Sequence, residues 1–95
     1  MIKIKQSSGI ISVKGHAHYA EPGNDIVCAA VSTLAQNLIA SIVELTEDEI
    51  QYEMQPGNIE IKYRNLSEAA QLLVDSFFVG IGLIAGAYPA YVRIV

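Results

Sequence analysis

Apolar and polar residues alternate in four short segments of this chain, the pattern of strands that bury one face. The segments Met1–Lys5 and Ile11–Lys14 are joined by a Ser-Ser-Gly sequence typical of a tight turn. The segments Ile50–Met54 and Ile59–Arg64 are joined by Gln-Pro-Gly-Asn, which also favours a turn. The pattern therefore predicts two β-hairpins.

Two longer segments repeat their apolar residues every three or four positions, as amphipathic helices do. The first spans about residues 25–45. Its core-facing stripe comprises Val27, Val31, Leu34, Leu38, Ile42 and Leu45. The second begins at Asn65 or Ser67, both good N-caps, and ends at about residue 87. The tail Tyr91–Val95 is β-prone and predicts a short edge strand.

The order of these elements, ββαββα(β), indicates an α/β (α+β) fold in one domain, residues 1–95. Each predicted strand has one apolar and one polar face, so helices can cover only one side of the sheet. We expect a two-layer sandwich: a mostly antiparallel sheet of four to five strands with two helices on one face.

The second helix has more apolar surface than one sheet can cover. The stripe that we assign to the core is Leu73, Phe77, Gly80, Ile84 and Ala87. A second stripe is Val74, Phe78, Ile81 and Ala85. Either the first helix covers this second stripe or a second copy of the chain does, forming a homodimer. The hydrophobic share of 52% favours the homodimer.

Composition narrows the function classes. The net charge of −4 gives no support for direct binding of nucleic acid. No uninterrupted apolar run reaches the length of a membrane span, and the N-terminal segment lacks the apolar core of a signal peptide. A lone cysteine cannot form an internal disulfide. We expect a cytoplasmic protein that does not engage a membrane.

The segment from Gly15 to Ser32 holds the only cysteine and both histidines. Asp25 is a good N-cap, which places Cys28 in the first turn of a helix, where the peptide dipoles favour a nucleophilic thiolate. Ser32 follows one turn later on the same side. The alternative is a buried structural thiol.

Either His16 or His18 could act as a base for this thiol, because strand alternation points both to one side. Two histidines and one cysteine lack the fourth donor and the paired spacing of a zinc site, so we expect neither a metal nor another cofactor. The intervening loop contains Gly23, which either serves as the hinge of a closing loop or belongs to a helix-entry turn.

The segment GHAHYAEPGNDIVCAAVS closely resembles the signature of the ribosomal-processing cysteine protease family, Prp. That signature is Gly-His-Ala, Tyr-Ala, Gly, Asp-(Ile/Leu)-Val-Cys-Ala and a serine four residues after the cysteine. The tail LIAGAYPAYVRI and the length of the chain are also similar to the family.

The resemblance implies that Cys28 is the nucleophile and His16 the general base, with His18 at a variable position. Asp25, Ser32 and Gly15 then fall on supporting positions of the motif, as does Gly23 in a loop that moves when substrate binds. The resemblance further implies a homodimer in the bacterial cytoplasm. Its substrate would be the precursor of large-subunit ribosomal protein twenty-seven, cleaved after a pair of phenylalanines.

Thiol-dependent peptide hydrolysis on that substrate needs an apolar cleft, for which Tyr19, Ile39 and Val43 are candidates. The competing hypothesis is a non-catalytic, ribosome-associated homodimer whose cysteine is structural. A redox sensor that uses one thiol is a third.

Overall fold

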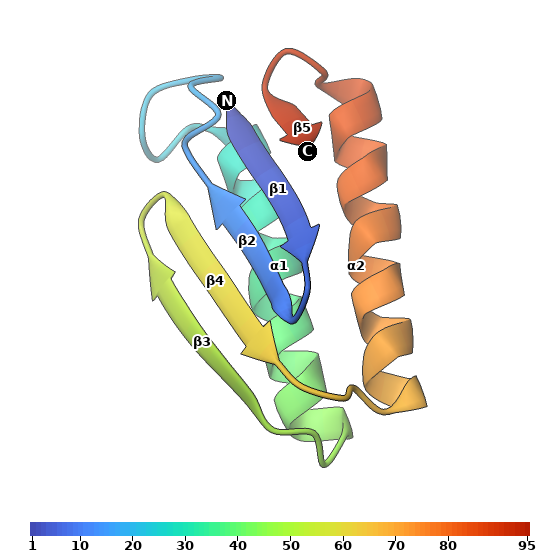
Figure 1. Ribbon diagram of the computed structural model, residues 1–95. Coiled ribbons are helices and arrows are strands. Elements are labelled where there is room, and N and C mark those ends of the chain that lie inside the picture. Colours follow the sequence, from blue (N-terminus) through green and yellow to red (C-terminus); the bar gives the residue numbers. More distant parts are fainter.

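Two helices of 20 residues lie against one face of a five-stranded sheet (Figure 1). The computed structural model describes all residues, 1–95. In chain order the elements are β1 (Ile2–Ser7), β2 (Ile10–Lys14), α1 (Ile26–Leu45), β3 (Ile50–Gln55), β4 (Asn58–Tyr63), α2 (Glu68–Ala87) and β5 (Val92–Ile94). The predicted fold class, with both helices on one face, is confirmed.

The strands lie in the order β3-β4-β2-β1-β5. Neighbouring strands are antiparallel except β1 and β5, which are parallel because α2 carries the chain back along the sheet. The β-prone tail thus forms an edge strand, as predicted. The opposite edge is β3, and its apolar residues Tyr52 and Met54 remain about half exposed.

The core lies between the sheet and the helices. Its strand residues are Ile2, Ile4, Ile11, Val13, Ile59, Ile61 and Val92. From α1 it takes Val27, Val31, Ala35, Leu38, Ile39 and Ile42. The predicted stripe of this helix is correct at four positions and wrong at Leu45, which is 72% exposed in the last turn. Leu34 is half-buried because it packs against α2.

The assignment of faces on α2 was wrong in part, although Phe77 is buried as assigned. The buried residues of this helix are Ala70, Val74, Phe77 and Ile81, so two members of the stripe expected at a homodimer interface lie in the core of the monomer. Of the residues assigned to the core, Ala87 is exposed. The reason is helix packing: a Cβ on Gly80 would lie 2.9 Å from Leu34 Cδ1, so this glycine lets the two helices approach closely.

By length and composition both helices could cross a membrane, although no uninterrupted apolar run in the sequence is long enough. Core helices of α/β proteins pass the same test. Here each helix buries one face under the sheet, α1 through residues such as Val31 and α2 through residues such as Val74.

Candidate active site

The cysteine lies where the β2–α1 loop enters α1. Asp25 caps the helix, as predicted: its Oδ1 accepts from the backbone N–H groups of Val27 and Cys28, at 3.0 and 2.9 Å. Its Oδ2 accepts from the N–H groups of Tyr19 and Ala20, at 3.0 and 3.4 Å. One carboxylate therefore ties the loop to the start of the helix.

These hydrogen bonds affect the ionisation of that carboxylate. The N–H of Cys28, with smaller contributions from Tyr19 and Ala20, holds the pKa of Asp25 below its usual value and outweighs the opposing effect of desolvation. Asp25 is therefore a stable anion at the helix start. It acts on the loop and the helix, and it makes no hydrogen bond to either histidine.

The sulfur of Cys28 is half-buried and accepts a hydrogen bond from the N–H of Ala17, at 3.3 Å. Ala17 is itself buried and directly follows His16. The thiol is thus fixed next to the histidine segment, whereas the sequence could not say whether the two meet.

Cys28 and His16 line one cavity of about 440 Å³. Its walls come from the end of β2 and the following loop, the first turns of α1, and the β3–β4 hairpin. The lining includes Gly15, His16, Cys28, Val31, Ser32, Gln36, Met54, Gln55, Pro56, Gly57 and Asn58. No hydrogen bond joins the imidazole to the sulfur, but both groups line the same cavity.

The backbone of the histidine segment is anchored on both sides. The N-terminal ammonium donates to the carbonyl of His16 at 2.7 Å, and the N–H of Gly15 donates to the carbonyl of Gly57 at 2.9 Å. Gly15 has φ +102°, and a Cβ there would overlap the carbonyl oxygen of Met1. Only glycine fits this position.

The imidazole of His16 lies on the turn of the β3–β4 hairpin. A Cβ on Gly57 would be 2.5 Å from His16 Nε2, so the missing side chain leaves the space that the ring occupies. Gly57 also has φ +73°, which favours glycine in the turn. The turn was predicted, but no pattern in the sequence indicated that it reaches the histidine.

The structure separates the two histidines. His18 is exposed, has φ +56° and does not line the cavity, and its ring centroid lies 5.9 Å from that of His16. Of the two candidate bases, only His16 shares the cavity with the thiol.

Of the remaining candidate site residues, some lie at the cavity or in the adjoining loop and others lie elsewhere. Ser32 and Gly15 line the cavity, and Gly23 lies in the loop with φ +90° and open space around it. Tyr19 instead packs edge-on against Tyr88 and Tyr91. The cavity does not include Ile39, which is only 4% exposed in the core, or Val43, which lies two turns beyond Gln36 on α1. The apolar wall of the cavity includes Met54 and Val31, which sequence reasoning missed.

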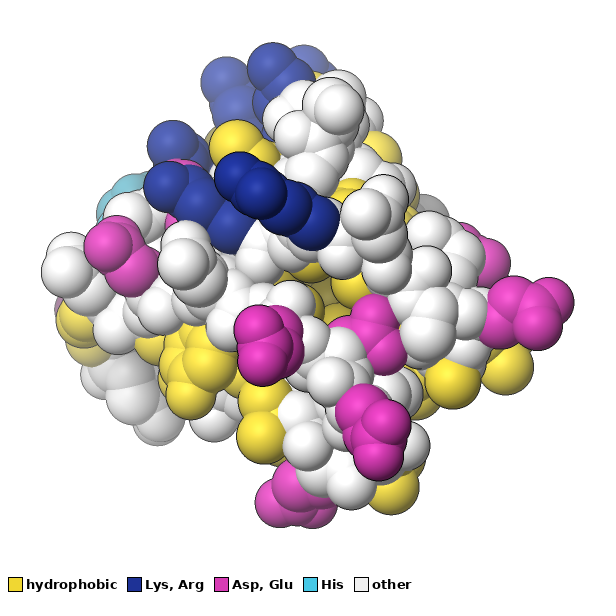
Figure 2. Space-filling model, turned by 60° about the horizontal axis from the view of Figure 1, so that its bottom comes forward, with side chains coloured by type: hydrophobic (Ala, Val, Ile, Leu, Met, Phe, Trp, Pro, Cys, Tyr) yellow, Lys and Arg dark blue, Asp and Glu magenta, His cyan; other side chains and the backbone are white.

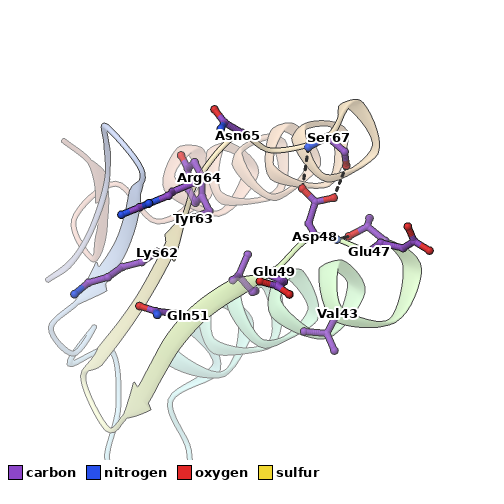
Figure 3. Close-up of a pocket in the computed structure, with 12 residues that line it drawn as sticks. Val43, Glu47, Asp48, Glu49, Gln51, Lys62, Tyr63, Arg64, Asn65 and Ser67 are labelled. Carbon is purple, nitrogen blue, oxygen red and sulfur yellow. Dashed lines mark hydrogen bonds between the residues drawn. The ribbon is translucent and has the colours of Figure 1, made fainter.

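A larger hollow of about 1190 Å³ lies at the other end of the molecule, between the end of α1 and the start of α2 (Figure 3). It includes Val43. Its central contact joins Asp48 to the N–H and hydroxyl of Ser67, and the hydroxyl chiefly holds the pKa of Asp48 below its usual value. It contains no cysteine or histidine, so we place the chemistry in the smaller cavity.

Comparisons with known proteins identify the family. A family model described as Cysteine protease Prp matches residues 1–93. The Ribosomal processing cysteine protease Prp of Mycoplasma genitalium is 32% identical over 98 residues, covering 99% of this chain and 94% of that protein. The protein of the same name from Staphylococcus aureus is 29% identical over 87 residues, covering 88% and 82%.

Solved structures share the fold. The S. aureus protease in complex with a covalently linked product peptide gives a TM-score of 0.88 at 24% identity, covering 98% of this chain and 94% of that one. The same protease with a substrate peptide gives 0.83 at 23% identity, covering 99% and 95%. A protein from Streptococcus mutans gives 0.74 at 31% identity, covering 98% and 89%.

Proposed function

The chain belongs to the Prp family of ribosomal processing cysteine proteases, and on that premise we propose that it removes the N-terminal extension of large-subunit ribosomal protein twenty-seven by cleaving after aromatic residues. The observation that carries the proposal is the shared cavity of Cys28 and His16. The relatives named as ribosomal processing proteases, and the S. aureus enzyme crystallised with a substrate peptide, support a peptide from a ribosomal protein as the substrate.

In the proposed reaction His16 takes the proton of Cys28, and the thiolate attacks the carbonyl carbon of the scissile bond. The resulting tetrahedral intermediate collapses to a thioester as the imidazolium gives its proton to the leaving amine. Water, activated by the neutral imidazole, then hydrolyses the thioester and releases the carboxylate and the thiol.

The oxyanion of the intermediate needs a hydrogen-bond donor near the sulfur. The start of α1 is a weak source of such a donor, because Asp25 already accepts from the N–H groups of Val27 and Cys28. The N–H of Ala17, which lies 3.3 Å from the sulfur, is the better candidate. It can turn from the sulfur to the oxyanion once the new carbon–sulfur bond has formed.

The aromatic residues of the substrate would pack on the exposed apolar side of β3. Met54 and Tyr52 pair with the buried residues Ile59 and Ile61, so they share the helix-facing side of the sheet. No helix covers them at this edge, and Met54 lines the cavity of Cys28. This surface replaces Tyr19, Ile39 and Val43 as our proposed binding site for the aromatic side chains.

Cleavage of a synthetic peptide that carries two phenylalanines before the scissile bond tests the proposal. We expect Cys28→Ala to abolish turnover, and His16→Ala to lower kcat/KM by about 100- to 10,000-fold. His18→Ala is the matched control and should keep most activity. Turnover that persists in Cys28→Ala would exclude covalent catalysis by this thiol. Equal cleavage of a peptide with alanines in place of the phenylalanines would exclude the aromatic specificity.

The proposal also covers the assembly and location of the enzyme. We propose a homodimer in the cytoplasm, where reducing conditions keep the single thiol free. Support for the homodimer comes from α2, whose solvent side exposes Leu72, Val79 and Leu83 opposite the buried residues Val74 and Ile81. The competing hypothesis of a non-catalytic protein with a structural cysteine is set aside, because the curated relatives are cysteine proteases.

A further inference from the structure

Five of the six cationic side chains of the chain lie on strands of the sheet and the sixth directly follows a strand, although the net charge is −4. Neither helix contains a lysine or arginine. The six are Lys3 and Lys5 on β1, Lys14 on β2, Lys62 on β4, Arg64 just after β4, and Arg93 on β5. In the view of Figure 2 the cationic side chains gather at the top and upper left, and most acidic side chains lie below them and to the right. The net charge therefore does not reveal that cationic and acidic side chains are unevenly distributed over the molecule.

Three of these cations form one row across neighbouring strands. Lys3 is paired with Lys14 on one side and with Arg93 on the other. All three are exposed, and they alternate with buried residues such as Ile2 and Val92, so they project from the face opposite the helices. No element covers that face (Figure 1). Lys5 lies on the same face one step along β1.

This row has no counter-ion within the protein. The only ion pair joins Lys62 and Glu60, at 3.8 Å, further across the sheet. Like charges directly opposite one another in a sheet repel and weaken the pairing of their strands. An anion bound across Arg93, Lys3 and Lys14 would relieve this repulsion.

The surroundings of the row identify the chemistry of its partner. On this face the strands β1, β2 and β5 carry one large hydrophobic side chain, the half-buried Ile10, and Val95 is exposed just after β5, whereas protein interfaces centre on buried clusters of aromatic or aliphatic residues. The three cations line neither the large hollow beside Ser67 nor the cavity of Cys28, as expected for an extended ligand and not for a small anion. A flat row of lysine and arginine matches the regularly spaced charges of a phosphate backbone.

We propose that the open face of β1, β2 and β5 binds the phosphate backbone of RNA through Arg93, Lys3 and Lys14, with Lys5 beside them. The charge pattern stands independently of the protease activity. The choice of RNA over another polyanion rests on the proposed function. If the substrate is a ribosomal protein, the enzyme meets it close to RNA. Lys14 is two residues from His16, so RNA held here would lie near the active-site end of the sheet.

Binding of a fluorescein-labelled single-stranded RNA oligomer, measured by anisotropy between 50 and 200 mM salt, tests the proposal. Four phosphate contacts predict a slope of log K against log salt of about −3. The triple variant replaces three of the four cations: Lys3→Gln, Lys14→Gln, Arg93→Gln. At the lowest salt concentration it should bind RNA at least about tenfold more weakly, and the magnitude of its slope should fall by about 2. Its melting temperature verifies that it folds.

The matched control is Thr33→Glu, Ala40→Glu, Ala69→Glu, which changes the net charge by the same amount at exposed helix positions. It should keep the slope and most of the affinity. Absence of RNA binding by the unmodified protein at 50 mM salt overturns the proposal, as does an equal loss in the control. Binding to phosphatidylserine vesicles without binding to RNA would assign the face to lipid instead.

Cleavage of the synthetic peptide, measured on the same variants, separates this proposal from the protease function. Both triple variants should cleave the short peptide at the rate of the unmodified protein, because none of the changed residues lines the cavity of Cys28. Loss of peptide cleavage in the glutamine variant alone would make the row part of the substrate site and refute the RNA proposal. Failure of all proteins to cleave would refute only the protease function.

Discussion

At the scale of single residues, the proposed base is positioned by glycines as much as by its own contacts. Gly15 lets the chain pass close to Met1, and Gly57 leaves room for the imidazole of His16. Both glycines adopt a positive φ, and the N–H of one donates to the carbonyl of the other. The β3–β4 turn, distant in sequence from the segment Gly15–Ser32, thus forms the surface on which the histidine lies.

We predict that Gly57→Asn lowers kcat/KM by about 100-fold, since a displacement of about 1 Å at a catalytic group has this effect. Asparagine tolerates a positive φ, so the turn should persist while the new Cβ pushes against His16 Nε2. The loss should fall mainly on kcat and alter the pH–rate profile of the peptide assay.

Gly9→Asn is the matched control for that substitution. Gly9 has φ +74° in the β1–β2 turn and its Cβ would meet the carbonyl of Tyr63, so the strain is comparable but distant from the histidine. Equal losses of activity in both variants would mean that Gly57 acts only through the stability of the fold.

At the scale of elements, the entry to α1 organises the site. The carboxylate of Asp25 accepts four N–H groups, two from the helix and two from the loop, and so holds the loop against the helix that carries Cys28. A glycine-containing loop that stays attached through one side chain is suited to open and close. The mobility of the loop around Gly23 remains a prediction.

We predict that Asp25→Ala releases the loop. In this variant, hydrogen exchange of the Tyr19 and Ala20 amides should become faster, and kcat/KM should fall. The control is Ser32→Ala, in which these two amides should exchange as slowly as in the unmodified protein. Because the pKa of Asp25 is lowered in the folded state, its stabilising effect is complete above the ordinary value of about 3.9 and is lost as the pH falls below it. Loop exchange that is unchanged in Asp25→Ala would contradict this role.

The start of α2 shows how local contacts can stabilise the fold without serving the site. The hydroxyl of Ser67 donates to Asp48 and accepts from the N–H of Ala70, which links the α1–β3 connection to the second helix (Figure 3). This contact lies in the large hollow, away from the cysteine.

We predict that Ser67→Ala destabilises the protein by about 1 kcal/mol, the usual cost of losing an N-cap. Thermal unfolding measures the loss, with Ser76→Ala on the exposed side of α2 as the control. Peptide cleavage below the melting transition should be unchanged. A strong loss of kcat in Ser67→Ala would instead connect the large hollow to catalysis.

At the scale of the whole molecule, the sequence left open what covers the apolar surface of α2 that the sheet cannot cover. Part of it is internal, because Val74 and Ile81 pack into the monomer core. The remainder lies on the opposite side of α2, where Leu72, Val79 and Leu83 are each about 70% exposed. The homodimer expected from composition is therefore proposed through this side of the helix.

We predict that Val79→Glu combined with Leu83→Glu shifts the protein from dimer to monomer, because the charges would be buried against the second copy. Light scattering coupled to size-exclusion chromatography gives the mass. Val43→Glu, at an exposed position on α1, is the control and should not change it. A mass that is unaffected by both changes on α2 would remove this face from the interface.

Local patterns in the sequence were enough to predict most of the fold. Strand alternation and helical periodicity depend only on residues that are close together in the chain. The predictions made from them are confirmed: the order of elements, the two hairpins, the N-cap Asp25 and the edge strand at the tail. The signature around Cys28, which indicated the Prp family, is equally local, and the family model over residues 1–93 confirms the family. Periodicity failed for α2, because a helix that is apolar on several sides does not reveal which side faces the sheet.

What only the tertiary structure decided are the relations between residues far apart in the chain. The separation of His16 from His18, the contact of His16 with Gly57, and the row formed by Lys3, Lys14 and Arg93 all depend on which strands become neighbours. Strand pairing joins segments through hydrogen bonds that any backbone can make. Those contacts are therefore settled by packing of the whole core, not by a local pattern.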